Sequence, residues 1–263
     1  MPDEPTDAAA VYERLFVPAE FQEWAPRVAD AARIQTGQRV LDVACGTGVL
    51  TREAATRAGP SGFVAGFDLD AGMLAMAARV SRGISWCRGS ADSLPFANAA
   101  FDAVVSQFGL MFFPDRRQAL REMLRVTAAG GHVAIAVWDT LVRTPAYLAL
   151  VGLLERFAGR KASDALRAPF ALGDRRLLAG LLAEAGMAGA MITTVAGTGR
   201  FPNVRTMVEA ELKGWMPMVG ITLSAEDIER VVEESQAALA PFVTPDGSVH
   251  FDSPAHLVTI SVP

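Results

Sequence analysis

A short segment in the first third of the chain has residues whose types and spacing could bind a nucleoside. An apolar run leads into Asp42, and Gly46 and Gly48 form a Gly-x-Gly turn shortly after it. Asp68 follows Gly48 by 20 residues, at the end of a second apolar run. Glycines at such a turn let the backbone approach a ligand where the next helix begins, and an acid at this spacing can reach a ribose. The pattern predicts a nucleoside-binding site.

The kind of nucleoside follows from what the turn lacks. A dinucleotide-binding turn has a third glycine that lets the helix pack close behind a pyrophosphate, and this chain has Thr51 at that place. The Gly-Lys-Ser/Thr sequence of a phosphate loop is also absent after Gly48. Asp42 faces the same turn, where its charge would repel a phosphate and attract a ligand with an ammonium and a sulfonium. These features favour a cationic ligand over the alternative, a nicotinamide-dependent oxidoreductase.

The composition limits size, partners and location. A chain of 263 residues, 51% of them hydrophobic, can bury a core as one domain, 1–263. The net charge of −5 and the lack of a Lys/Arg cluster argue against a nucleic-acid partner and favour a small or neutral substrate. No apolar run reaches the roughly 20 residues that span a bilayer, and residues 1–6 lack a signal-peptide pattern. With Cys45 and Cys87 expected as free thiols, we predict a soluble, cytoplasmic protein.

The elements that must position the turn alternate between apolar strands and amphipathic helices. This alternation is typical of an α/β fold with a parallel sheet covered on both faces. We expect strands at 39–43, 63–67, 84–88, 101–106, 132–138, 191–197 and 255–262. We expect helices at 49–58, 71–82, 115–127, 144–159, 174–185, 203–215 and 224–240. Gly59, Gly83 and Gly130 stand at or just after the ends of the first three helices and would stop them.

Two segments in the second half interrupt this pattern. The core is expected at about 30–138 and 174–200 plus 254–263. Between these parts, 140–173 contains an apolar helix and then a mixed connector from 161, and 201–250 contains two helical stretches. We interpret both segments as insertions that form a helical lid.

Five motifs, in order between residues 40 and 138, resemble those of the class I S-adenosylmethionine-dependent methyltransferases. They are 40–48, 66–70, 89–96, 101–108 and 129–135. The similarity is to the small-molecule group that includes the ubiquinone and menaquinone biosynthesis enzymes. It implies a Rossmann-like, seven-stranded, mostly parallel sheet with helices on both faces, and S-adenosyl-L-methionine as cofactor. One departure is Ala44, where many relatives have the first glycine of the turn.

The resemblance also implies how the turn and the second strand would bind the cofactor. The backbone of Ala44 and Gly46 would hold its methionine portion, and Gly48 belongs to the same turn. Asp68 would accept hydrogen bonds from both ribose hydroxyls. Asp42 would add negative charge beside the cation, and it could also cap the adjoining loop, since the two roles are compatible.

Adenine would lie on the next loops of the sheet. Leu69 and Met73 would pack on it, although Met73 could equally be a core residue. Asp92, with the Ala91 amide, would bond the exocyclic amine and a ring nitrogen.

The sulfonium would lie beside Gln107 and Phe108. These residues end the fourth predicted strand, and ligands bind at the carboxyl ends of strands in open α/β sheets. Phe108 and Met111 could instead simply pack the top of the sheet.

Two apolar sets lie outside the motifs. The N-terminal set could close over the cofactor or form an amphipathic stripe that covers the sheet, and we favour the stripe. Its members are Tyr12, Phe16, Phe21 and Trp24. The lid set would give a hydrophobic acceptor pocket or a dimer contact. Its members are Phe170, Trp215, Met216 and Met218.

No general base is evident from the sequence. His132 is expected to be structural, and His250 and His256 have no partner spacing that suggests catalysis. Metal-ligand spacing is not found, and the Asn/Asp-Pro-Pro-aromatic tetrapeptide of nucleic-acid amino methyltransferases is missing at the fourth strand. We therefore expect transfer to an O, N or C nucleophile of a small, apolar methyl acceptor, by alignment and desolvation without metal, in a monomer or homodimer. A non-catalytic cofactor-binding module is the alternative from another class.

Overall fold

The computed structural model describes residues 8–263. The expectation about a signal peptide falls on residues 1–6, which lie outside the described part of the chain.

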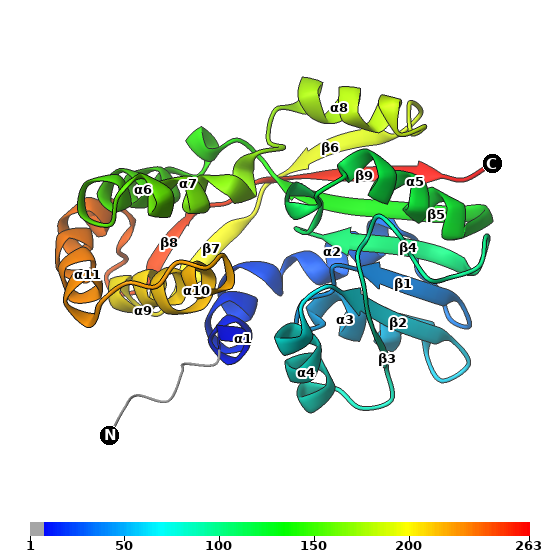
Figure 1. Ribbon diagram of the computed structural model, residues 1–263, viewed down its shortest axis with the longest axis horizontal. Helices are drawn as coiled ribbons and strands as arrows, with labels where there is room; N and C mark the ends of the chain where they lie inside the picture. The colour runs from blue at the N-terminus through cyan, green and yellow to red at the C-terminus, as the bar shows by residue number, and fades with distance from the viewer. Residues whose placement is uncertain (1–7) are drawn as a thin grey trace.

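Seven strands form the central sheet, in the order β3-β2-β1-β4-β5-β9-β6 (Figure 1). Their bounds are β1 Arg39–Val43, β2 Phe63–Asp68, β3 Ser85–Arg88, β4 Phe101–Gln107, β5 Thr127–Trp138, β6 Met191–Val195 and β9 Ala255–Ser261. β1 to β5 pair in parallel, while β9 runs antiparallel to both β5 and β6. The predicted seven-stranded, mostly parallel sheet is confirmed.

The central strands are buried because helices cover both faces of the sheet (Figure 1). The segment 40–43 of β1 and the segment 133–138 of β5 are buried at every position. Strands in this setting need continuous apolar runs rather than alternating patterns. Because β1 lies between β2 and β4, the sheet order brings the carboxyl ends of these three strands together.

Five helices pack on the sheet, and three of them begin at side-chain caps. The five are α2 Trp24–Ala31, α3 Val49–Ala58, α4 Ala71–Val80, α5 Arg116–Val126 and α8 Arg175–Glu184. Side chains of Asp70, Asp115 and Asp174 accept backbone N–H bonds in the first turns of α4, α5 and α8. These caps satisfy donors that the helix itself leaves unpaired.

The remaining elements form a second lobe, the lid lobe, beside the carboxyl ends of β4 and β5 (Figure 1). Its helices are α1 Ala8–Val11, a π-helix Tyr12–Phe21, α6 Pro145–Phe157, α7 Arg160–Arg167, α9 Val204–Glu209, a π-helix Ala210–Trp215, α10 Met216–Met218 and α11 Ala225–Leu239. Its strands are β7 Thr198–Phe201 and β8 Val249–Asp252, which pair antiparallel. Short 3-10 turns are Leu110–Phe112, Leu141–Arg143, Ala168–Phe170 and Ala240–Phe242.

Each lobe has a hydrophobic core of its own. Leu150, Leu154 and Met207 are fully buried in the core of the lid lobe, apart from the core beneath the sheet. Phe21 and Phe170 pack against both cores. These two aromatic side chains therefore join the lobes.

The structure corrects the predicted lid. The segment predicted as a mixed connector at 161–173 contains most of α7 and a 3-10 turn. The strand predicted at 191–197 ends at Val195, and β7 follows it as a separate strand. The lid is thus not wholly helical, because β7 and β8 pair within it. Each of these two strands has only four residues, which is too short for alternation to be recognised reliably.

A second correction concerns Gly130. It does not end a helix, because α5 ends at Val126 and β5 already begins at Thr127. Gly130 lies within β5 with a φ of 75°, close to a register shift between β4 and β5. Such bulges use glycine for its left-handed conformation, and this explains why the residue looked like a helix stop.

Among residues 8–263, no helix combines the length and the apolar character required to cross a bilayer.

Gly48→Ala is expected to destabilise the protein more than Gly83→Ala. Both glycines have a left-handed φ, of 88° and 79°, so either alanine strains the backbone by about 1–2 kcal/mol. At Gly48 the new Cβ would also lie 2.5 Å from Cη2 of Trp86, whereas nothing lies within 4 Å at Gly83. Overpacking of this kind costs ~1–3 kcal/mol. Urea unfolding of both variants measures the difference, and equal losses would contradict the role of Trp86.

Candidate active site

The turn after β1 is an unusual backbone segment. Ala44, Gly46 and Gly48 all have left-handed φ angles, of 59°, 54° and 88°. The N–H of Cys45 donates to the carbonyl of Phe67 at 3.1 Å, which fixes the turn against β2. Ala44 thus adopts the conformation of the glycine that it replaces, at a cost that non-glycine residues pay mainly at functional sites.

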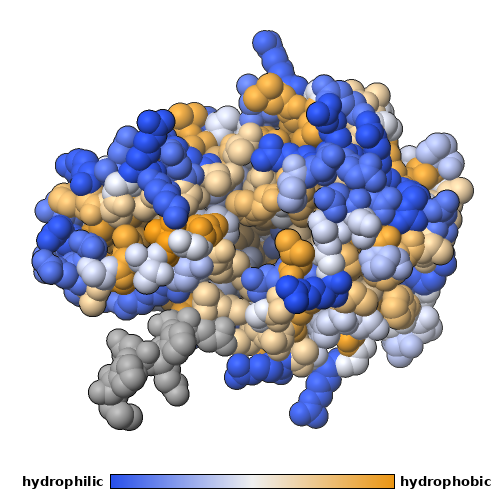
Figure 2. Space-filling model, in the orientation of Figure 1, coloured by the Kyte–Doolittle hydropathy of each residue, from blue (hydrophilic) through white to orange (hydrophobic). Residues whose placement is uncertain are grey.

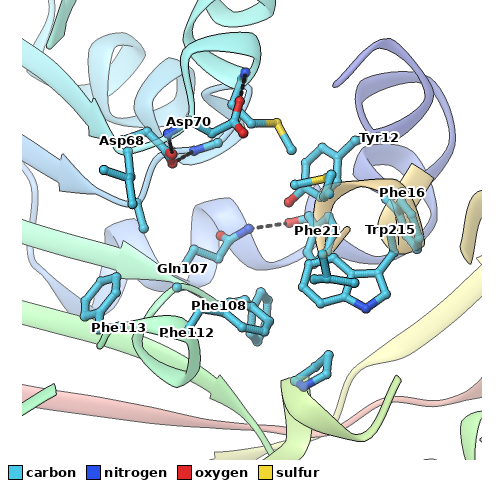
Figure 3. Close-up of a pocket in the computed structure, with 18 of the residues that line it drawn as sticks. Tyr12, Phe16, Phe21, Asp68, Asp70, Gln107, Phe108, Phe112, Phe113 and Trp215 are labelled. Atoms are coloured by element: carbon cyan, nitrogen blue, oxygen red, sulfur yellow. Dashed lines mark hydrogen bonds between the residues drawn. The ribbon is translucent and has the colours of Figure 1, made fainter. Parts of the chain in front are cut away.

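Asp68 connects this turn to the end of β2. Its Oδ2 accepts the N–H of Gly46 at 2.8 Å, and its Oδ1 accepts the N–H of Asp70 at 2.8 Å (Figure 3). Burial raises the pKa of Asp68, and the backbone hydrogen bonds lower it in part. A carboxylate with each oxygen bonded once keeps further lone pairs that can accept hydrogen bonds from a ligand.

Asp42 lies behind the turn. It is only 1% exposed, and its Oδ2 accepts the hydroxyl of Thr51 at 2.6 Å. Burial raises the pKa of Asp42 to about 7, although the hydrogen bond from Thr51 lowers it. Thr51 holds this carboxylate inside the protein, and Asp42 is not among the residues that line the cavity, so its role beside the ligand stays a prediction.

A cavity of about 390 Å³ opens where the turn, the ends of β2 and β4, and the lid lobe meet. Figure 2 shows the molecular surface hollowed between the two lobes, with hydrophobic residues around the hollow. The cavity is lined by most of the predicted cofactor residues, namely Ala44, Gly46, Asp68, Leu69, Met73, Ala91, Gln107 and Phe108. Asp42, Gly48 and Asp92 are not among its lining residues.

Aromatic rings from the N-terminal π-helix form one wall of the cavity (Figure 3). The rings of Phe21 and Tyr12 stack at 5.1 Å, and that of Phe21 lies 5.8 Å from that of Phe108. The side chain of Gln107 donates to the carbonyl of Phe21 at 3.0 Å and fixes this helix to the end of β4. The favoured interpretation as a stripe covering the sheet is therefore wrong for Tyr12, Phe16 and Phe21, whereas Trp24 is indeed a fully buried core residue.

The predicted lid residues lie on the other side of the cavity. Phe170, Trp215 and Met218 line it, whereas Met216 is buried in the core of the lid lobe. The indole N–H of Trp215 donates to the carbonyl of Ala165 at 3.1 Å, which holds the ring in place. The predicted apolar pocket thus exists, with three of the four residues named for it.

The cavity lining contains acidic side chains but no basic ones. The acids are Glu20, Asp68, Asp70 and Glu211, and no lysine, arginine or histidine is among the lining residues. Aromatic faces and carboxylates together attract a cation. The lining therefore suits a positively charged ligand, as the sequence suggested from the turn alone.

A buried cluster in the cavity wall has no local pattern in the sequence that would indicate it. Tyr147 lies with its hydroxyl 3.0 Å from Oε2 of Glu20 and 2.5 Å from Oε1 of Glu211. The three residues come from the N-terminal π-helix, α6 and the second π-helix, and all line the cavity. Their distances of 127 and 64 residues along the chain hide them from any local pattern.

The histidines lie outside the cavity lining. His256 is buried between the carbonyl of Gly173, at 2.7 Å, and Asp139, at 3.5 Å. His132 contacts the hydroxyl of Ser261 at 3.0 Å, and His250 contacts that of Ser248 at 3.2 Å. Within residues 8–263, no three His, Cys, Asp or Glu side chains are grouped so that they could hold a metal ion. Cys45 and Cys87 are free, and β2 lies between their strands.

Comparison with known proteins agrees with this geometry. Residues 41–135 match the family model described as a methyltransferase domain. A 2-phytyl-1,4-naphtoquinone methyltransferase of Thermosynechococcus vestitus is 38% identical over 133 residues, which are 48% of this chain and 59% of that protein. A demethylmenaquinone methyltransferase of Renibacterium salmoninarum is 43% identical over 115 residues, which are 44% of this chain and 47% of that protein.

A solved structure extends the likeness in fold over nearly the whole chain. Phosphoethanolamine N-methyltransferase 2 of Haemonchus contortus, in complex with S-adenosylhomocysteine, matches with a TM-score of 0.61 and 17% identity. The match covers 98% of this chain and 58% of that one.

The fold and the matched domain are those of the class I S-adenosylmethionine-dependent methyltransferases that this chain resembles. Over the matched part, the chain is similar to methyltransferases whose names state quinone substrates. The aligned part spans about half the length of the two quinone-modifying relatives.

Asp42→Asn is expected to remove a pH dependence of stability. Because the folded state raises the pKa of Asp42 from 3.8 to about 7, ionisation favours the unfolded chain. The wild-type protein should lose unfolding free energy relative to the variant as the pH rises from about 4 to 7, by about 3 kcal/mol. Asparagine keeps an oxygen for the Thr51 hydroxyl. Urea unfolding across this range measures the effect, and parallel curves for the two proteins would contradict it.

Proposed function

We propose that this protein transfers the methyl group of S-adenosyl-L-methionine to an O, N or C nucleophile of a small, apolar metabolite. The observation that carries the proposal is the cavity at the ends of β1, β2 and β4. It combines a left-handed turn and Asp68 with a lining of aromatic rings that includes acidic side chains and no basic ones.

The lining fits the cofactor. S-adenosyl-L-methionine, when bound, supplies an electrophilic methyl group on a sulfonium. The backbone of Ala44 and Gly46 would hold its methionine portion, and the free lone pairs of Asp68 would accept the ribose hydroxyls. Leu69, Met73 and Ala91 would surround adenine, and Asp92 in the same loop stays a predicted partner of its amine.

The chain's own contribution would be alignment and exclusion of water. The rings of Phe108 and Trp138 stack at 3.6 Å, and Phe21 packs on both. Gln107 is fixed by its bond to the carbonyl of Phe21. Holding two reactants in line can supply about 7–11 kcal/mol of the barrier, and a closed apolar site strengthens electrostatic interactions.

The acceptor proposed is a quinone-type or similar flat, apolar molecule. The names of the two relatives state quinone substrates. In this chain Phe112 and Trp215, with ring centroids 5.0 Å apart, and Met218 give the cavity an apolar side suited to a flat ring. Four further expectations stay predictions. They are transfer without a metal, a cytoplasmic location, a single domain with a core and lid insertions, and a monomeric or homodimeric state.

Asp68→Asn is expected to weaken the binding of S-adenosylmethionine and of S-adenosylhomocysteine by about tenfold to a hundredfold. Replacing a charged acceptor by a neutral one weakens each ribose hydrogen bond. Calorimetry measures both affinities, with Asp164→Asn on the exposed face of α7 as the matched control. Unchanged affinity for both molecules would remove the ribose assignment. Tight binding of NADH to the wild-type protein would favour an oxidoreductase.

Methyl transfer itself is expected with a simple probe. Incubation with labelled S-adenosylmethionine and 1,4-dihydroxynaphthalene should give a methylated product detectable by mass spectrometry, and heat-denatured protein serves as control. A metabolite extract tests other acceptors in the same assay. If the protein binds the cofactor but methylates nothing in probe or extract, a non-catalytic binding module is favoured.

A further inference from the structure

The cluster of Glu20, Tyr147 and Glu211 has a particular proton balance. The hydroxyl of Tyr147 lies within hydrogen-bond distance of both carboxyl groups, but it has only one proton to donate. One carboxyl group must therefore be protonated and donate to the tyrosine oxygen. When that group is Glu211, Glu211 donates to Tyr147, and Tyr147 donates to Oε2 of Glu20.

Glu20 is the end of this cluster that lacks a partner. It is 94% buried, since its exposed fraction is 6%, and its Oε1 has no hydrogen-bond partner in the structure. No ion pair between described residues joins a cation to Glu20 or Glu211. Buried polar atoms are almost always hydrogen-bonded, so a free carboxyl oxygen in a cavity wall indicates a polar group on the ligand.

The environment keeps the cluster weakly acidic. Burial raises the pKa of Glu20 to about 8, although the hydrogen bond from Tyr147 lowers it. Burial and the nearby Glu20 raise the pKa of Glu211 well above its ordinary value. When Glu20 ionises, the hydrogen bond from Tyr147 stabilises its anion.

Other charged groups near Glu20 do not neutralise it. Glu23 raises the pKa of Glu20, and Tyr12, on the same π-helix, is a buried neutral phenol whose own pKa is raised. On β7, which packs against this helix, Arg200 is exposed and forms no ion pair with Glu20 among the described residues. Ionised Glu20 therefore keeps one carboxylate oxygen, Oε1, without a partner.

The position of the cluster points to the acceptor rather than to the cofactor. All three residues lie outside 41–135, the part that matches the methyltransferase-domain model. Glu20 and Glu211 lie in two π-helices, a rare geometry that occurs frequently at functional sites. Tyr147 packs on Phe170, with ring centroids 5.8 Å apart, on the lid side of the cavity.

We propose that Glu20 is the proton acceptor for a hydroxyl group of the methyl acceptor, with Tyr147 and Glu211 as positioning residues. This rests on the proposed function. As the hydroxyl oxygen forms its bond to the methyl carbon, the carbon–sulfur bond breaks with its electron pair on sulfur, and the hydroxyl proton passes to Oε1 of Glu20. The acceptor class is accordingly an aromatic, apolar molecule that presents a hydroxyl.

A binding experiment tests this without turnover. The full chain is titrated with 2-naphthylmethanol, which does not ionise, and with the similarly shaped 2-ethylnaphthalene, with and without saturating S-adenosylhomocysteine. In the wild-type protein the preference for the alcohol should rise about tenfold as the pH rises through about 8, because a charged acceptor makes the stronger hydrogen bond. Glu20→Gln should abolish this rise and leave S-adenosylhomocysteine binding unchanged.

Further variants separate a proton-accepting role from a structural one. Tyr147→Phe keeps the Glu20 carboxyl but removes its donor, so the midpoint of the pH dependence should move upward. Glu209→Gln is the matched control, because Glu209 lies near Glu211 in the sequence and is partly exposed. This variant should behave as wild type. Thermal unfolding checks that each variant is folded.

Three results would overturn the assignment of Glu20. The first is a wild-type preference for the alcohol that does not change with pH, and the second is a pH-dependent preference in Glu20→Gln equal to that of the wild type. The third is a loss of S-adenosylhomocysteine binding in Glu20→Gln as large as its loss of alcohol binding. Failure of the wild-type protein to bind S-adenosylhomocysteine would instead refute the proposed function, and the titration without it still tests Glu20.

Discussion

The pair of hydrogen bonds accepted by Asp68 is the constraint on which the site depends. One carboxylate, at the end of β2, holds the N–H of Gly46 in the turn after β1 and the N–H of Asp70 at the start of α4. A left-handed Ala44 in that turn costs about 1–2 kcal/mol, which the turn's fixed bonds must offset. The same residue lines the cavity, so the side chain that shapes the turn also forms part of the site.

The second lobe makes this turn into an enclosed site. The N-terminal π-helix is fixed to β4 through Gln107, and its Phe21 packs against both hydrophobic cores. Rings near this junction include the close stack of Phe108 on Trp138. A shift of the lid lobe would therefore change the walls of the cavity and leave the turn intact.

How much the sequence could predict depends on the range of the interactions involved. The seven strands follow from apolar runs. The position of Asp68 at the cavity follows from its spacing to a turn of adjacent residues. The location of Asp42 does not, because the Thr51 hydroxyl that holds it inward is visible only in three dimensions. A pattern of aromatic residues shows that Tyr12 and Phe21 share a face, but it cannot show that this face lines a cavity. Gly130 looked like a helix stop because a bulge and a cap use the same backbone conformation.

Similarity to known proteins therefore covers one half of the cavity and not the other. The turn, Asp68 and Gln107 all lie within residues 41–135, where the methyltransferase-domain model matches. Glu20, Tyr147 and Glu211 lie outside it and meet only because the π-helices and α6 pack together. A buried carboxyl pair that shares one tyrosine is costly to keep unless a ligand or a reaction uses it. Differences in acceptor among related chains should therefore be sought in the lid lobe, where such side chains can change without disturbing the bonds of Asp68.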